Sequence, residues 1–130
     1  MSNGKTGELD LVIHNGKRMK LAADIRQHID NLDRAGLLVR MGREINKDTE
    51  VHPIVRWQYR GGIPEEKRKA FLFETVVDSK GKRYETPNLV GGLAGSRSIY
   101  AIGMACAPEE IPARWANALE NPCYGYSLGQ

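Results

Sequence analysis

The segment Ala70-Phe71-Leu72-Phe73-Glu74-Thr75-Val76-Val77 decides the fold, because it is the strongest strand candidate in the chain. Aromatic and β-branched side chains dominate it, and such residues favour strands. A turn follows at residues 78–82, and the chain then returns in a second strand predicted over Tyr84–Val90. Pro87 interrupts this second strand. Because proline has no amide hydrogen to donate to a neighbouring strand, it favours an edge position or a strand start.

Upstream of this segment, an apolar stripe predicts a helix. Leu21, Ile25, Ile29 and Leu32 recur at spacings of four, four and three residues, as side chains on one face of a helix do. Gly36 follows at the place where a left-handed residue ends such a helix.

Between that helix and Ala70, the sequence predicts a strand and a further helix. Leu37, Val39 and Met41 alternate with other residues, which is typical of a half-buried strand. A helix is then predicted over about Glu50–Arg60, before a pair of glycines. Pro53 is compatible with this helix only in its first turn, where few backbone donors are needed.

Downstream of the second strand, Gly91–Gly95 is predicted to form a loop. A helix should run from Ser96 or Arg97 to Cys106. Pro108 opens a last helix, with acidic residues in its first turn, where the helix dipole favours them. The apolar stripe of this last helix is Ile111, Trp115 and Leu119.

Helices interleaved with strands indicate an α/β or α+β fold, here a single small domain with a short mixed sheet and flanking helices. Residues 1–20 are predicted to form a flexible N-terminal arm, with a short strand at Leu11–Ile13 and a turn at Asn15-Gly16. The domain proper spans 21–122, and 123–130 form a tail without periodicity.

Composition narrows the functional classes. The chain has 130 residues, 41% hydrophobic and 27% charged residues, and a net charge of +3, as expected of an ordinary globular protein. So mild a charge argues against a dedicated nucleic-acid binder. The weakly polar stretch Leu89–Ala107 is broken by glycines and an arginine, so it is a poor membrane span. The sequence therefore predicts a cytoplasmic protein with free thiols.

No catalytic or metal-binding set is recognisable from spacing. His14, His28 and His52 have no partner at the spacing of metal ligands. Cys106 is expected to be a buried structural thiol. Cys123 has no obvious base beside it that would activate a nucleophile.

Two basic and aromatic groups have alternative interpretations. Trp57 and Tyr59, with neighbouring arginines, either form a stacking platform or anchor their helix against the sheet or a partner. Lys67–Lys69 is a basic cluster diluted by Glu65 and Glu66, which favours a solvated loop.

The most informative local string is Gly91-Gly92-Leu93-Ala94-Gly95-Ser96-Arg97. It lies between a predicted strand and a predicted helix, where backbone amides of the helix start bind anions. Arg97 would add a fork of donors to a phosphate or a carboxylate. The string matches neither the dinucleotide fingerprint nor the P-loop, so a purely structural turn is the alternative.

Four strings occur in a particular order along the chain. They are Leu21–Arg40 followed by Arg43-Glu44-Ile45, then Lys69–Glu74, Pro87–Arg97 and Tyr100–Met104. Together they resemble the N-terminal region of the UbiD-type decarboxylases, which use prenylated flavin mononucleotide (prenylated FMN). The likeness covers about Leu21–Pro122. It departs at Gly92, where family members often carry Asn, and at Pro53, which is unusual in the second helix.

The resemblance implies that the catalysis lies elsewhere. In the family, the metal-holding residues and the Glu-Arg-Glu catalytic set lie downstream of the matched region, so the resemblance assigns no catalytic, cofactor-binding or metal-binding residue to this chain. Prenylated FMN and a divalent metal ion are expected in a longer catalytic subunit. The chain starts at Met1 and continues past the matched region to Gln130, which suits a small subunit better than an arbitrary fragment.

Two hypotheses from different classes result. In the first, the chain is a small non-catalytic subunit of a decarboxylase or carboxylase for an aromatic, heteroaromatic or other unsaturated carboxylic acid. It packs on the catalytic subunit and shapes its cleft, without nucleic acid or membrane partners. In the second, it is a free-standing module that binds an anion or nucleotide through the Gly91–Arg97 loop; RNA binding through the basic loops is a third, weaker idea. Expected cleft or interface residues are Gly92, Gly95, Ser96 and Arg97, with Trp57, Trp115, Tyr124 and Tyr126 at the subunit interface.

Overall fold

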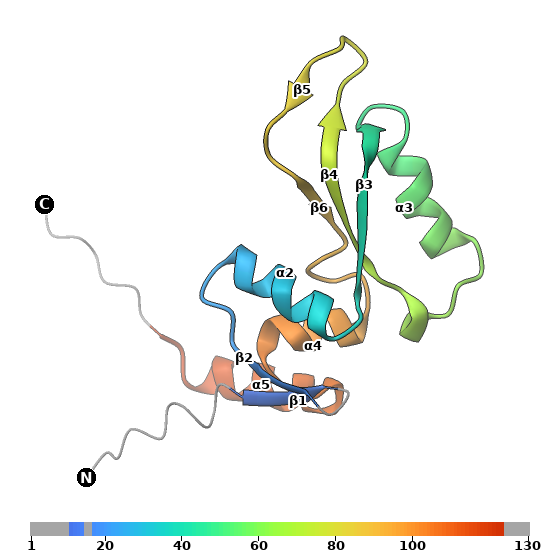
Figure 1. Ribbon diagram of the computed structural model, residues 1–130. Helices are drawn as coiled ribbons and strands as arrows, with labels where there is room; N and C mark the ends of the chain where they lie inside the picture. Colours follow the sequence, from blue (N-terminus) through green and yellow to red (C-terminus); the bar gives the residue numbers. More distant parts are fainter. Residues whose placement is uncertain (1–10, 15–16, 124–130) are drawn as a thin grey trace, which may run out of the picture.

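A computed structural model describes residues 11–14 and 17–123 of the chain (Figure 1). Helices and strands alternate along the chain, so the predicted α/β class is confirmed. The elements are β1 (Leu11–His14), β2 (Lys17–Lys20), α2 (Ile25–Arg34), β3 (Leu38–Asn46), α3 (Val51–Arg60), the short 3₁₀ helix η1 (Glu65–Lys67), β4 (Ala70–Val77), β5 (Arg83–Tyr84), β6 (Asn88–Val90), α4 (Arg97–Met104), the 3₁₀ helix η2 (Pro108–Glu110) and α5 (Ile111–Glu120).

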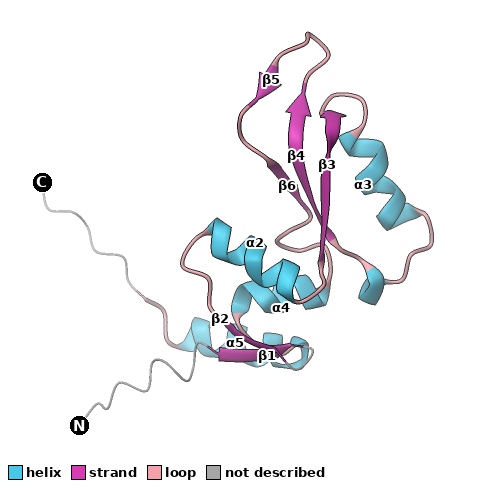
Figure 2. Cartoon of the chain, viewed as in Figure 1, coloured by secondary structure: helices cyan, strands magenta, loops and turns pink. Residues whose placement is uncertain are grey.

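The strand predicted at Ala70–Val77 is β4, and it lies inside a short mixed sheet (Figure 2). β3 pairs with one edge of β4 in parallel, from Leu38 opposite Ala70 to Asn46 opposite Val77. α3 provides the crossover connection that a parallel pair requires. β5 and β6 pair with the other edge of β4 in the antiparallel sense. The predicted mixed sheet with flanking helices is therefore confirmed.

The second predicted strand is divided in two at its proline. Pro87 lies between β5 and β6, which end and begin at Tyr84 and Asn88. Since proline cannot donate to the ladder, the pairing with β4 stops there and resumes at Asn88 opposite Phe73. Among the described strands, β5 and β6 have β4 as their neighbour on one side only, which is the edge position that Pro87 predicts.

The first helix starts later than its apolar stripe predicts. α2 begins at Ile25, because the side chain of Asp24 accepts a hydrogen bond from the amide of Gln27 (3.0 Å) and caps the helix. Leu21 precedes the helix, and both Leu21 and Ile25 are exposed, so this part of the prediction is wrong. The buried face of α2 instead carries His28, Asn31 and Leu32.

The described residues form two clusters of buried side chains, one associated with α2 and α4 and the other with α3. The first cluster contains Leu32, Ala35, Leu37, Ala70, Ile99 and Ile102. The second contains Ile45, Phe71, Phe73 and Val76, with Val51, Ile54 and Val55 of α3 packed against it. Alternate residues of β4 point to opposite faces, so this strand joins the two clusters.

The C-terminal helices correct one expectation. α4 ends at Met104, two residues before the predicted end at Cys106, because Ala105 adopts a left-handed conformation (φ 50°). In the apolar stripe predicted for α5, Ile111 is half-buried and the other two residues are exposed. Trp115 is 50% exposed and Leu119 is 75% exposed. Helical spacing reveals that a face is apolar, but it does not reveal what covers that face.

At the N-terminus, β1 and β2 pair in the antiparallel sense, so the predicted strand at Leu11–Ile13 is present. The turn predicted at Asn15-Gly16 lies outside the described residues, as do the first ten residues of the predicted arm. The limits of the domain, 21–122, stay a prediction.

Candidate anion and partner site

The Gly91–Arg97 string joins β6 to α4, as its position between a strand and a helix predicts. Gly91 adopts a positive φ of 71°, a conformation that favours glycine. Gly95 lies where a Cβ atom would come within 2.6 Å of the Gly91 carbonyl oxygen and 2.9 Å of the Tyr59 hydroxyl. Any side chain at Gly95 would therefore displace backbone or Tyr59, so this glycine fixes the close approach of loop and α3.

Gly92 is hydrogen-bonded to a residue of α2. Its carbonyl oxygen accepts a hydrogen bond from Nε2 of His28 at 2.6 Å, and both residues are buried. Because a carbonyl oxygen only accepts, Nε2 carries the proton. This bond satisfies both polar groups inside the molecule and ties the loop to α2. The spacing of the histidines gave no sign of it.

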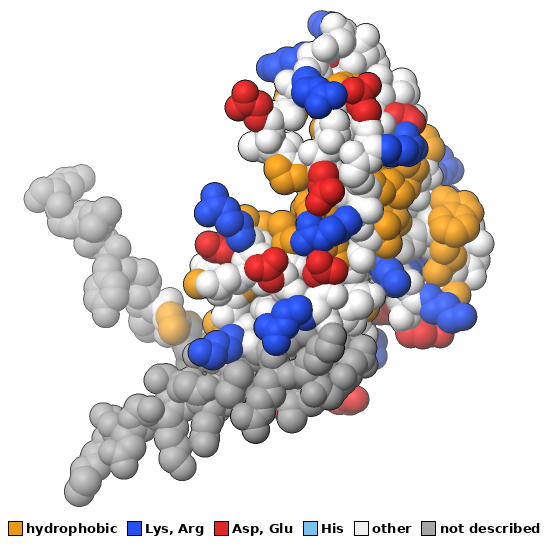
Figure 3. All heavy atoms as spheres, in the orientation of Figure 1, with side chains coloured by type: hydrophobic (Ala, Val, Ile, Leu, Met, Phe, Trp, Pro, Cys, Tyr) orange, Lys and Arg blue, Asp and Glu red, His pale blue; other side chains and the backbone are white. Residues whose placement is uncertain are grey.

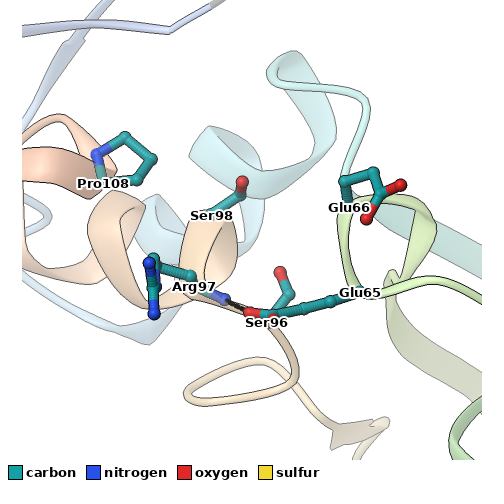
Figure 4. A pocket seen from close by; sticks show the side chains of 6 residues that line it. All are labelled: Glu65, Glu66, Ser96, Arg97, Ser98 and Pro108. Carbon is teal, nitrogen blue, oxygen red and sulfur yellow. Dashed lines mark hydrogen bonds between the residues drawn. The ribbon is translucent and has the colours of Figure 1, made fainter.

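The N-terminus of α4 is already bound to an anionic side chain of this chain (Figure 4). The hydroxyl of the buried Ser96 caps the helix by accepting from the amide of Ile99 (3.2 Å). The amide of Arg97 donates to Oε1 of Glu65 at 2.8 Å. The backbone amides of Ile99 and Arg97, which an external anion would need as donors, are therefore already bonded to Ser96 and Glu65.

The side chain of Arg97 remains available on the surface. Figure 4 shows its guanidinium turned away from Glu65 and Glu66. Within the described part of the chain, no hydrogen bond or ion pair engages this guanidinium. It borders a hollow of about 280 Å³ that is lined by Glu65, Glu66, Ser96, Arg97, Ser98 and Pro108.

A second hollow, of about 410 Å³, lies between η1 and α4 and brings in residues that the sequence analysis missed. Arg68 lies over the ring of Tyr59, with its guanidinium carbon 5.1 Å from the ring centroid. The hydroxyl of Tyr100 accepts from Nε1 of Trp115 at 2.9 Å. The lining residues of this hollow are Glu65, Arg68, Ala94, Gly95, Ser96, Arg97, Tyr100 and Ile111.

The sequence predicts a solvated basic loop around Arg68, because Glu65 and Glu66 dilute the charge of that segment. Only the tertiary fold places η1 beside the start of α4. The run of basic residues was the sole sequence signal for Arg68. The expectation that Gly92, Gly95, Ser96 and Arg97 belong to a cleft or interface stays a prediction.

An apolar hollow of about 430 Å³ lies beside α3. Met41, Pro53, Ile54, Trp57 and Phe71 line it, and Trp57 is 63% exposed. The hydroxyl of Tyr59 instead approaches the Gly91–Gly95 loop. Residues two apart on a helix do not face each other, so Trp57 and Tyr59 serve different surfaces rather than one stacking platform.

The burial predicted for Cys106 is confirmed. Cys106 is buried and Cys123 is exposed, and both are free thiols. Burial raises the pKa of the Cys106 thiol, which disfavours the reactive thiolate. A nucleophilic role for Cys106 therefore has no physical support in its surroundings.

Residues 11–14 and 17–123 contain no cluster of three or more His, Cys, Asp or Glu side chains that could hold a metal ion. The placement of prenylated FMN and its metal in a partner stays a prediction. Among these same residues, no helix has the length and apolar character needed to cross a membrane.

Comparison with known proteins gives one family. The family model of the 3-octaprenyl-4-hydroxybenzoate carboxy-lyase N-terminal domain, UbiD_N, matches residues 29–119. The match includes β3, α3, β4, the glycine loop and the whole of α4. A search of the curated proteins and a search of the solved structures each found no match.

Proposed function

This chain belongs to the UbiD_N family of carboxy-lyase N-terminal domains, and from that premise we propose that it is a small non-catalytic subunit of a decarboxylase or carboxylase. The enzyme uses prenylated FMN and acts on an aromatic, heteroaromatic or other unsaturated carboxylic acid. A longer UbiD-type subunit supplies the cofactor, its divalent metal and the catalytic residues. The present chain packs on that subunit and completes one wall of its cleft.

The observation that carries this proposal is the apolar surface beside α3. Hydrophobic side chains gather along the seam between β3 and α3 (Figure 3). The hollow there is lined by apolar residues, and the ring of Trp57 stands at its border, 63% exposed. Exposed tryptophan beside an apolar hollow is typical of the core of a protein interface. Covering this surface by a partner would remove it from water.

The charges around this surface indicate what its partner presents. α3 has the sequence VHPIVRWQYR, which contains two arginines and no acidic residue. Arg56 and Arg60 are exposed. Interfaces place opposite charges against each other, so the catalytic subunit is expected to offer an apolar anchor surrounded by carboxylates.

A second apolar surface supports the same role. Trp115 and Leu119 of α5 project into solvent, and the hydrogen bond from Trp115 to Tyr100 fixes the indole ring. A ring that is already held loses little conformational freedom on binding. Tyr124 and Tyr126, which are also proposed for the interface, lie outside the described residues.

When bound in the catalytic subunit, prenylated FMN supplies the electrophilic centre that accepts negative charge as carbon dioxide leaves. The residues of the present chain have another task. They cover the cleft, exclude water from it and position the glycine loop at its edge. The chain alone should therefore be inactive.

The test is an activity comparison. The isolated chain, and the complex purified with the chain as bait, are assayed for release of carbon dioxide from aromatic acids. Activity only in the complex, together with peptide identification of a longer chain that carries the UbiD catalytic region, is expected. Decarboxylation by the isolated chain would refute the proposal.

A further inference from the structure

We propose that the hollow between η1 and α4 is a binding site for the carboxylate of a small unsaturated acid, with Arg68 and Arg97 as its anion-binding residues. The class of ligand rests on the proposed function, and the inference goes beyond that function by assigning ligand binding to this chain itself. The hollow has a volume of about 410 Å³, which lies within the range of small-molecule pockets.

Arg68 carries the first part of the argument. Its Nε is a buried donor that has no hydrogen-bond acceptor among the described residues. A buried donor without an acceptor is costly, and more so when it is charged. The guanidinium is also held in place over the Tyr59 ring. Arg68 also lines the hollow, and a planar guanidinium that is held in place matches the geometry of a carboxylate.

Two further donors border the same hollow. The guanidinium of Arg97 has no acceptor within the described ranges and points away from Glu65 and Glu66 (Figure 4). The oxygen of Tyr100 accepts from the indole of Trp115. Its own hydroxyl hydrogen, for which the described residues provide no acceptor, remains for a ligand.

The charge of the site selects the kind of anion. Arg68 and Arg97 contribute two positive charges, and Glu65 contributes one negative charge, so one positive charge remains. A monoanion balances it, whereas a phosphate dianion would leave one negative charge in excess. Ala94 and Ile111 supply apolar walls, which suit the flat body of an unsaturated acid.

The experiment is a titration of the ¹⁵N-labelled full chain with sodium benzoate at constant ionic strength. The reporters are the Arg68 Nε–H and the Trp115 Nε1–H resonances. Saturable shifts with a dissociation constant on the order of 1–10 mM are expected. Benzamide, which has the same ring without the charge, should cause none.

Three variants locate the site. Arg68→Lys keeps the charge but loses the guanidinium fork, and Arg97→Gln removes an exposed charge; each should weaken benzoate binding about tenfold. The matched control, Lys67→Gln, removes a neighbouring charge that does not line the hollow and should leave binding unchanged. Because Arg97 is exposed, its variant stays informative even if Arg68→Lys fails to fold.

Several results would overturn the inference: no saturable shift up to about 50 mM benzoate, an equal response to benzamide, or tighter binding of inorganic phosphate. If benzoate is inert but a glutamate-containing peptide shifts both resonances, the arginines bind an acidic side chain of a protein, and the small-acid site is wrong. None of these results bears on whether a longer subunit co-purifies, so the two proposals fail separately.

Discussion

His28 and Gly92 are 64 positions apart in the chain, and a 2.6 Å hydrogen bond joins the imidazole Nε2 of the first to the carbonyl oxygen of the second. The bond connects α2 to the loop before α4. It therefore positions the glycine loop that begins the candidate site, and it does so from inside the core.

Replacing His28 by alanine should destabilise the fold. The Gly92 carbonyl would be left buried without a donor, at a cost of about 1–3 kcal/mol in the free energy of unfolding. Urea unfolding measures this cost. His52→Ala is the matched control, because His52 is an exposed histidine on α3, and its effect should stay within about 0.5 kcal/mol. Equal effects of the two variants would contradict the role given to the bond.

Glu65→Ala should weaken the junction of η1 and α4. The variant removes the acceptor of the Arg97 amide and the negative charge at the helix N-terminus, so a loss of about 1 kcal/mol is expected. Thermal unfolding of Glu65→Ala and Glu66→Ala compares two neighbouring carboxylates, of which only Glu65 bonds to α4. If both variants unfold at the temperature of the unsubstituted chain, the capping role is wrong.

Gly95→Ala should be strongly destabilising, by roughly 1–3 kcal/mol, because the new methyl group would overlap the Gly91 carbonyl and the Tyr59 hydroxyl. Gly42→Ala is the control. There the nearest atom to a Cβ is 3.5 Å away, an ordinary contact. Denaturant midpoints that fall by the same amount in the two variants would show that the loop has room at Gly95.

Acid should weaken the start of α3 through Glu50. The Asn46 amide, first, and the Arg43 guanidinium hold the pKa of Glu50 below its usual value. A depressed pKa in the folded state contributes stability above the unfolded pKa, near 4.5, and this stability is lost as the pH falls through the lower folded value.

The variant Glu50→Gln should therefore lose stability at neutral pH and show a shallower decline between neutral and acidic pH. The measurement is the urea midpoint of each protein as a function of pH. Glu85→Gln changes an exposed carboxylate outside the 46–50 turn and should follow the unsubstituted chain. Parallel pH profiles for Glu50→Gln and the unsubstituted chain would remove Glu50 from this role.

Local sequence predicts the elements whose formation depends mainly on their own residues. β4 follows from its aromatic and β-branched residues, and the gap between β5 and β6 follows from Pro87. The buried face of α2 does not follow from its apolar stripe. Asp24 caps the helix after Leu21, so Leu21 lies outside it. His28 can be buried because its hydrogen-bond acceptor comes from a loop that is distant in sequence.

The candidate site was only partly predictable for the same reason. Ser96 is a helix cap with a local signature. The carboxylate of Glu65 and the guanidinium of Arg68 reach the site only through tertiary contacts. Nor does spacing reveal that Trp115 and Leu119 of α5 remain exposed, since that depends on what packs against them.

Trp57→Glu should abolish association with the catalytic subunit while leaving the fold intact, because the side chain is 63% exposed and a charge there would have to be desolvated in an apolar interface. Co-purification yield and the unfolding midpoint are measured together. Lys80→Glu, in the exposed turn after β4, is the charge-reversal control and should retain the partner. If both variants retain the partner, the α3 surface is not the interface.

Native mass spectrometry of the tagged chain, purified from its source cells, tests subunit association most directly. The expected spectrum contains a hetero-oligomer of this chain with a longer chain that carries the UbiD catalytic region and prenylated FMN. A chain that is found only alone, and that releases carbon dioxide from an aromatic acid in that state, would contradict the proposed subunit role.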